Sequence, residues 1–106
     1  MATINAVGGN VNTNVVSTCI IKRFDTGVAD TETSYSFPAG TKRFTITNDG
    51  AATVQFTFTS GESNTEYIKL PTATSHFESN LGVNASLTVY LRCPVANQTL
   101  EIVSWK

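Results

Sequence analysis

Residues 86–93, "SLTVYLRC", decide the fold class, because apolar and polar side chains alternate along the whole stretch. A period of two places successive side chains on opposite faces of a β-strand, with the apolar face toward a core. The stretch therefore predicts a half-buried strand, whose expected core face consists of Leu87, Val89, Leu91 and Cys93.

The same alternation recurs through most of the chain, and no segment shows a sustained helical period. It is clear in residues 42–48 and 53–59, which are separated by the turn residues Asn48, Asp49 and Gly50. Because these residue types tolerate positive φ, we expect the two segments to form a β-hairpin. Further strands are expected at residues 15–24, 31–37, 65–70, 75–79 and 99–105.

Turn residues such as Gly27, Pro71 and Pro94 separate these segments at short intervals. Many short strands with frequent turns are typical of an antiparallel sandwich or a small barrel. The sequence therefore predicts an all-β fold, a single antiparallel β-sandwich of about eight short strands that is jelly-roll-like. The length of 106 residues suits one domain. We place that domain at residues 15–106 and an extended N-terminal arm at residues 1–14.

The arm is rich in Gly and Asn, and its apolar contacts are Ile4, Val7 and Val11. We expect it to be held either by a neighbouring subunit or along an edge strand of its own domain. The N-terminus carries no basic leader or continuous apolar run, so we expect synthesis in a reducing cytosol. In that setting Cys19 and Cys93 are expected to be buried small hydrophobes, with a disulfide between them as the less favoured alternative.

Charge excludes some classes of partner. Charged residues make up 14% of the chain, the formal net charge is -1, and the basic residues are scattered. A nucleic-acid interface needs a basic patch or stripe, so we expect no nucleic-acid partner. Because no apolar run approaches the roughly 20 residues that span a bilayer, we expect no membrane partner either.

Asp25-Thr26-Gly27 raises the possibility of a dimeric aspartic protease, in which each subunit supplies one catalytic carboxylate. Retroviral proteases also carry a Gly-rich flap and an aliphatic run ending in Gly near the C-terminus. The C-terminal residues 91–106, "LRCPVANQTLEIVSWK", contain no Gly. We therefore expect Asp25 to cap a turn after a strand and Gly27 to supply an unusual backbone dihedral.

Other candidate chemistry is sparse. His76 is the single histidine, and we expect it on the polar face of its strand with Thr74 and Glu78. Asp25, Asp30 and Glu32 could bind calcium, but they follow no known loop spacing, so solvated turn carboxylates are favoured. We expect no cofactor, no metal and no enzymatic activity.

Aromatic residues suggest two kinds of binding surface. Tyr35, Tyr67, Tyr90 and Trp105 would form a carbohydrate platform if they were coplanar on one sheet face. In residues 99–105, a core face formed by Leu100 and Ile102 would leave Val103 and Trp105 outside. Exposed apolar pairs in a small domain often mark interfaces, unless the chain's own N-terminal arm covers them.

The segment "FPAGTKRFTITNDGAATVQFTF" followed by "EYIKLP", within residues 37–71, resembles small β-sandwich virion proteins of tailed bacteriophages. The resemblance consists of a Pro-Ala-Gly turn, two alternating strands around an Asn-x-Gly turn, and a Tyr-Ile-x-Leu-Pro segment. It implies a capsid decoration (cement) or accessory protein of the virion, assembled in the host cytoplasm. The implied partner is the major capsid protein or another virion protein, and the implied state is a homo-oligomer, trimer or higher. The expected interface residues are Ile4, Val7, Val11, Val103 and Trp105.

Overall fold

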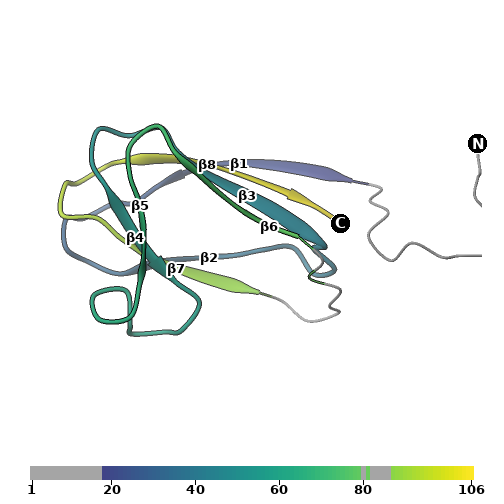
Figure 1. The fold of residues 1–106 in the computed structure, drawn as a ribbon, viewed down its shortest axis with the longest axis horizontal. Coiled ribbons are helices and arrows are strands. Elements are labelled where there is room, and N and C mark those ends of the chain that lie inside the picture. The colour runs from purple at the N-terminus through teal and green to yellow at the C-terminus, as the bar shows by residue number, and fades with distance from the viewer. Residues whose placement is uncertain (1–17, 80, 82–86) are drawn as a thin grey trace, which may run out of the picture.

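The computed structural model describes residues 18–79, 81 and 87–106. In these residues the chain forms strands and turns (Figure 1). The predicted arm at residues 1–14 lies outside the described part. The strands are β1 (Cys19–Asp25), β2 (Thr33–Ser36), β3 (Arg43–Asn48), β4 (Val54–Thr57), β5 (Ile68–Leu70), β6 (Ser75–Glu78), β7 (Thr88–Arg92) and β8 (Thr99–Trp105).

The eight strands form two antiparallel sheets that face each other. One sheet has the order β1-β8-β3-β6, and the other has the order β2-β7-β4-β5. Strands adjacent in sequence therefore lie in opposite sheets, except for β4 and β5, which pair directly. Eight strands in two such sheets form a jelly roll, so the predicted all-β, jelly-roll-like sandwich is confirmed.

The core fills the space between the sheets, and the alternation in the sequence determines which side chains enter it. In residues 86–93 the predicted core face is correct, because Val89, Leu91 and Cys93 are buried and Leu87 packs against them. In β3 and β8 the register pairs Ile46 with Ile102. The fully buried apolar side chains, each 0% exposed, are Phe44, Ile46, Val54, Phe56, Val89, Leu91, Leu100 and Ile102.

The predicted hairpin between residues 42–48 and 53–59 is wrong, because β3 and β4 belong to opposite sheets. The buried side chain of Asn48 redirects the chain at this point. Its Nδ2 donates to the carbonyl oxygens of Ala52 at 2.8 Å and Leu70 at 2.9 Å, and its Oδ1 accepts from the Gly50 amide at 2.8 Å. The side chain thereby replaces backbone partners that a hairpin would have provided.

Gly50 lies where the chain passes from β3 to β4 in the opposite sheet. Its φ is not positive, so its role there is close packing and not an unusual backbone dihedral. A Cβ at this position would lie 2.5 Å from Gln98 Oε1 and 3.0 Å from Gln98 Cβ. The same Oε1 accepts the Ala51 amide at 2.6 Å, and Gln98 Nε2 donates to the carbonyl of Ala96 at 3.0 Å. The Gly at position 50 therefore allows the turn to pack against the loop that precedes β8.

Asp25-Thr26-Gly27 forms a turn after β1, as expected. The Gly27 amide donates to Asp25 Oδ1 at 2.7 Å, and Gly27 has φ of 74°. Thr26 is 2% exposed, and its Oγ1 accepts the Gln98 amide at 3.0 Å. The Asp25 carboxylate therefore caps the turn as predicted, and the Thr26 hydroxyl adds a hydrogen bond that stabilises this corner of the sandwich.

Candidate functional site: the outer face of the sheet β1-β8-β3-β6

The sheet β1-β8-β3-β6 presents one face to the core and one face away from it. Strand register places the outward side chains in cross-strand rows. We call this surface the outer face and define it by Cys19, Ile21, Arg23, Asp25, Arg43, Thr45, Thr47, Ser75, Phe77, Thr99, Glu101, Val103 and Trp105.

A row of three apolar side chains and Thr45 crosses the middle of the outer face, and we call it the apolar row. Ile21 lies opposite Val103, Val103 opposite Thr45, and Thr45 opposite Phe77, so each of the four strands contributes one side chain. Ile21 is 65% exposed and Phe77 is 55% exposed. Hydrophobic burial contributes about 25 cal/mol per Å² of apolar area, so covering this row would favour association.

The next row toward the C-terminal end of β8 contains Trp105. Register places Trp105 between Cys19 of β1 and Arg43 of β3. The guanidinium carbon of Arg43 lies 5.2 Å from the centre of the Trp105 ring, a distance at which a cation–π interaction forms. Val103 and Trp105 therefore lie on the outer face, where the sequence placed them.

Cys19 also lies on this row, and its predicted burial is wrong. Its side chain is exposed, whereas Cys93 is buried, and both thiols are free. The reason is the register of β1, because pairing with Trp105 turns Cys19 to the outer face.

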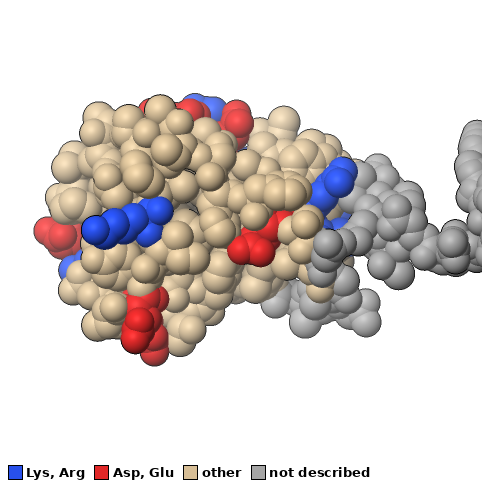
Figure 2. Space-filling model, viewed as in Figure 1, with Lys and Arg blue, Asp and Glu red and all other residues tan. Residues whose placement is uncertain are grey.

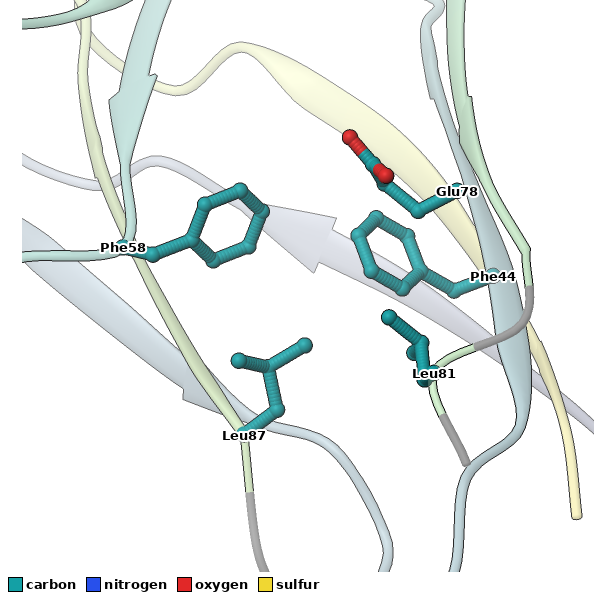
Figure 3. A pocket seen from close by; sticks show the side chains of 5 residues that line it. All are labelled: Phe44, Phe58, Glu78, Leu81 and Leu87. Carbon is teal, nitrogen blue, oxygen red and sulfur yellow. The ribbon is translucent and has the colours of Figure 1, made fainter. Parts of the chain in front are cut away.

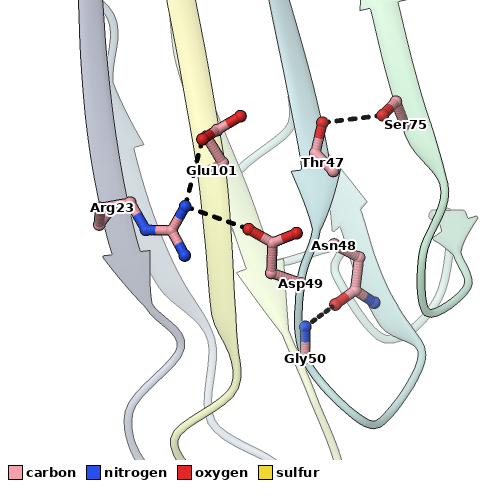
Figure 4. A network of polar contacts seen from close by, with 7 residues as sticks. All are labelled: Arg23, Thr47, Asn48, Asp49, Gly50, Ser75 and Glu101. Carbon is pink, nitrogen blue, oxygen red and sulfur yellow. Dashed lines mark hydrogen bonds and ion pairs between the residues drawn. The ribbon is translucent and has the colours of Figure 1, made fainter.

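A charged row borders the apolar row on its other side. Arg23 Nη1 lies 3.2 Å from Glu101 Oε2 and 3.1 Å from Asp49 Oδ2, so one guanidinium bridges two carboxylates (Figure 4). Alongside them, the hydroxyls of Thr47 and Ser75 are hydrogen-bonded at 2.8 Å. These exposed ion pairs contribute little to stability, but they fix the positions of charges at one end of the outer face.

The predicted orientation of residues 75–79 is wrong. Register pairs His76 with the core residue Ile46, so His76 and Glu78 face the interior side and Phe77 faces outward. The His76 ring packs edge-on against Phe56, with centroids 5.0 Å apart, and its Nε2–H donates to Glu78 Oε2 at 2.7 Å. The His76 imidazole can cover the edge of the core because its nitrogen is hydrogen-bonded to the Glu78 carboxylate. The alternation of side chains along β6 then leaves the Phe77 ring exposed.

The proposed carbohydrate platform is also wrong, because its aromatic residues do not share a face. Tyr35 packs against the core with its ring 5.2 Å from that of Phe37, and burial raises the pKa of its phenol. Tyr90 pairs with Ser34 and Thr57 on the outward side of the other sheet, away from Trp105.

An apolar cavity of about 220 Å³ opens between the sheets at one end of the sandwich. In Figure 3 the rings of Phe44 and Phe58 lie on either side of it, with the Glu78 carboxylate nearby. Leu81 and Leu87 complete the lining. The Glu78 carboxylate is engaged by His76, so the polar group at the cavity already has a partner.

Two of the three carboxylates considered for calcium, Asp25 and Glu32, accept hydrogen bonds from separate turns. Asp25 caps its turn, while Glu32 accepts the amides of Gly61 at 2.9 Å and Ser63 at 3.2 Å. Hydrogen bonds from Ser63 and from the Gly61 amide lower the pKa of the Glu32 carboxyl. Across residues 18–79, 81 and 87–106, no three His, Cys, Asp or Glu side chains gather in a way that could hold a metal ion.

The surface seen in Figure 2 is mostly uncharged, with Lys, Arg, Asp and Glu in small separate groups. Within the described part of the chain, no helix is long and apolar enough to cross a membrane. What distinguishes the outer face is therefore the apolar row, with apolar side chains on three strands and Thr45 on the fourth. Trp105 with Arg43 borders it on one side, and the Arg23 ion pairs border it on the other.

Neither a protein-family model nor a curated protein matches the chain. Among solved structures, the chain is similar to a de novo designed double-stranded β-helix determined by solution NMR, with a TM-score of 0.51 and 17% sequence identity. The match covers 85% of this chain and all of the designed one. At this identity the likeness shows the arrangement of strands alone.

The structure adds Ile21 and Phe77 to the surface predicted from Val103 and Trp105. A signal for Ile21 existed, because alternation in residues 15–24 separates Ile20 from Ile21 and only one of them can face the core. Phe77 gave a misleading signal, since a lone aromatic among polar residues is normally assigned to the core. Ile4, Val7 and Val11 lie outside the described residues, so their predicted role stays a prediction.

Proposed function

We propose that this chain is a non-enzymatic structural protein that joins a larger assembly through the outer face of the sheet β1-β8-β3-β6. In its narrower form, the proposal is a capsid decoration protein of a tailed bacteriophage, located in the virion. Its partner is the major capsid protein or another virion protein, and it acts as a homo-oligomer, trimer or higher.

The observation that carries the proposal is the apolar row on the outer face. Ile21 and Val103 lie side by side on β1 and β8, Thr45 separates Val103 from Phe77 in the same row, and Trp105 lies in the adjoining row. Ile21 and Phe77 are more than half exposed. Protein interfaces are enriched in aromatic residues and have apolar centres with polar rims, and the outer face has this composition.

Three further features support the narrower form. The resemblance of residues 37–71 to phage virion proteins is one, and the low charge of the chain is a second, because it limits repulsion between packed copies. The third is the jelly-roll architecture, which is frequent among viral capsid proteins. This use of the jelly-roll architecture is an argument by analogy, since one fold hosts many functions.

The test is incorporation of tagged variants into particles of the virus that encodes the chain, purified on a density gradient. We expect the wild-type chain to band with particles and the double variant Phe77→Ser, Trp105→Ser to stay in the soluble fraction. Tyr90→Ser is the matched control, because Tyr90 lies on the outward side of the other sheet, and it should band normally.

A second variant lacking residues 1–11 tests the predicted contribution of Ile4, Val7 and Val11, and we expect it to fold but not to band with particles. Near-UV circular dichroism of each purified variant separates loss of binding from loss of folding. Purified particles that carry no wild-type chain, or that incorporate the double variant as well as the wild type, would contradict the proposal.

A further inference from the structure

We propose that a second copy of this chain docks on the outer face, with the two sheets stacked and their strands antiparallel. The inference rests on the proposed function in one respect, that the outer face is an assembly contact. It goes further by assigning the outer face to the contact between copies within the proposed homo-oligomer, which leaves the contact with other virion proteins to other surfaces, and by giving the orientation of the two copies.

The charges on the outer face differ between its two ends. Arg43 lies at the end that carries Trp105, and register places both beside Cys19. Asp25 and Glu101 lie at the opposite end. Asp49 is also there, because its amide donates to the carbonyl of Thr99 at 3.1 Å. Arg23 neutralises part of this acidic end through its two ion pairs. The face is therefore positive at one end and has a net negative charge at the other.

Only one of the two face-to-face arrangements of identical copies brings these ends together. A two-fold axis across the strands, at the row of Val103, inverts the second sheet along its strands. It then places apolar row on apolar row and brings Arg43 of each copy toward the acidic end of the other, near Glu101. A two-fold axis along the strands would instead place like-charged ends together. Self-complementary contacts of the first kind are those that close a symmetric dimer.

The area of the outer face predicts a weak contact. Four strands at about 4.8 Å spacing and rows spanning about 20 Å along β1 give about 400 Å² per copy. A stable interface buries about 800 Å² per partner, so the isolated chain should be mainly monomeric at about 10 μM and dimeric near 1 mM. A contact of this strength becomes effective when other contacts hold neighbours at high local concentration.

The test is sedimentation equilibrium of the full chain from about 10 μM to 1 mM, combined with reversal of charges. Arg43→Glu and Glu101→Lys should each weaken self-association at least about tenfold, because each places like charges opposite one another. An equimolar mixture of the two variants should restore association to within about threefold of wild type, since both contacts become attractive again. Lys69→Glu, on the exposed edge strand β5 of the other sheet, makes the same charge change as Arg43→Glu and should have no effect.

The fluorescence of the single Trp, Trp105, provides a second measurement that needs no variant. Its emission should shift to shorter wavelength as concentration rises, because docking covers the ring. A wild-type chain that stays monomeric at 1 mM, an unchanged emission maximum, or a mixture that fails to restore association would overturn the inference. These results concern purified protein, so they are distinguishable from a failure of the particle test, which would overturn the proposed function instead.

Discussion

Replacing Asn48 by alanine should lower the unfolding free energy of this domain by more than the loss of one hydrogen bond, because the Asn48 side chain makes three. Asn48 is 0% exposed and makes three hydrogen bonds to the backbone, with Ala52, Gly50 and Leu70 as partners. Each lost bond costs about 1 kcal/mol when its partner stays buried, so the variant should lose about 3 kcal/mol of unfolding free energy. For a domain of this size that corresponds to a fall in Tm of about 12 to 24 °C.

Urea unfolding followed by Trp fluorescence, together with a thermal scan, measures both quantities. Asn64→Ala is the matched control, because Asn64 is exposed in a turn, and it should change the unfolding free energy by less than about 0.5 kcal/mol. A loss below about 1 kcal/mol for Asn48→Ala would refute the reasoning, since it would mean that water or other groups replace these bonds without cost.

Three further changes test the packing of the sandwich. Gly50→Ala should cost about 1 to 3 kcal/mol in urea unfolding, because its Cβ would lie 2.5 Å from Gln98 Oε1; an unchanged midpoint would contradict this. Ser104→Ala should raise stability by about 1 kcal/mol, since within the described residues Ser104 Oγ is buried without a hydrogen-bond partner; a loss would show that a partner exists. Because the pKa of Glu32 is lowered in the folded state, its stabilisation is present at neutral pH and lost as the pH falls below about 4.5. Glu32→Gln should therefore be less stable than wild type at neutral pH, and the difference should shrink as the pH falls below about 4.5, whereas a difference that stays constant into acid would contradict the assignment.

The strand pattern could be read from the sequence because alternation is a local property. Val89, Leu91, Leu100 and Ile102 each sit in a clear period of two, and all four are in the core. Topology is not local in this sense. Asn48 is compatible with a hairpin turn, and its actual role depends on Ala52 and Leu70 being placed around it by the rest of the fold.

Part of the candidate site was also predictable, because alternation along a single strand is a local property. The alternation of β8 places Val103 and Trp105 opposite Leu100 and Ile102, so their outward position follows from the sequence. The positions of Phe77 and Cys19 do not, because each depends on the register with a neighbouring strand. A shift of one residue in that register would reverse which side chains face the core.

The central claim is that the outer face is covered in the assembled state, and hydroxyl-radical footprinting tests it directly. Oxidation of Phe77 and Trp105 would be compared between the free chain at low concentration and the chain within purified particles. Tyr90 provides an internal reference on the outward side of the other sheet. Phe77 and Trp105 should become protected in particles, while Tyr90 should remain as reactive as before. Equal reactivity of Phe77 and Trp105 in both states would contradict it.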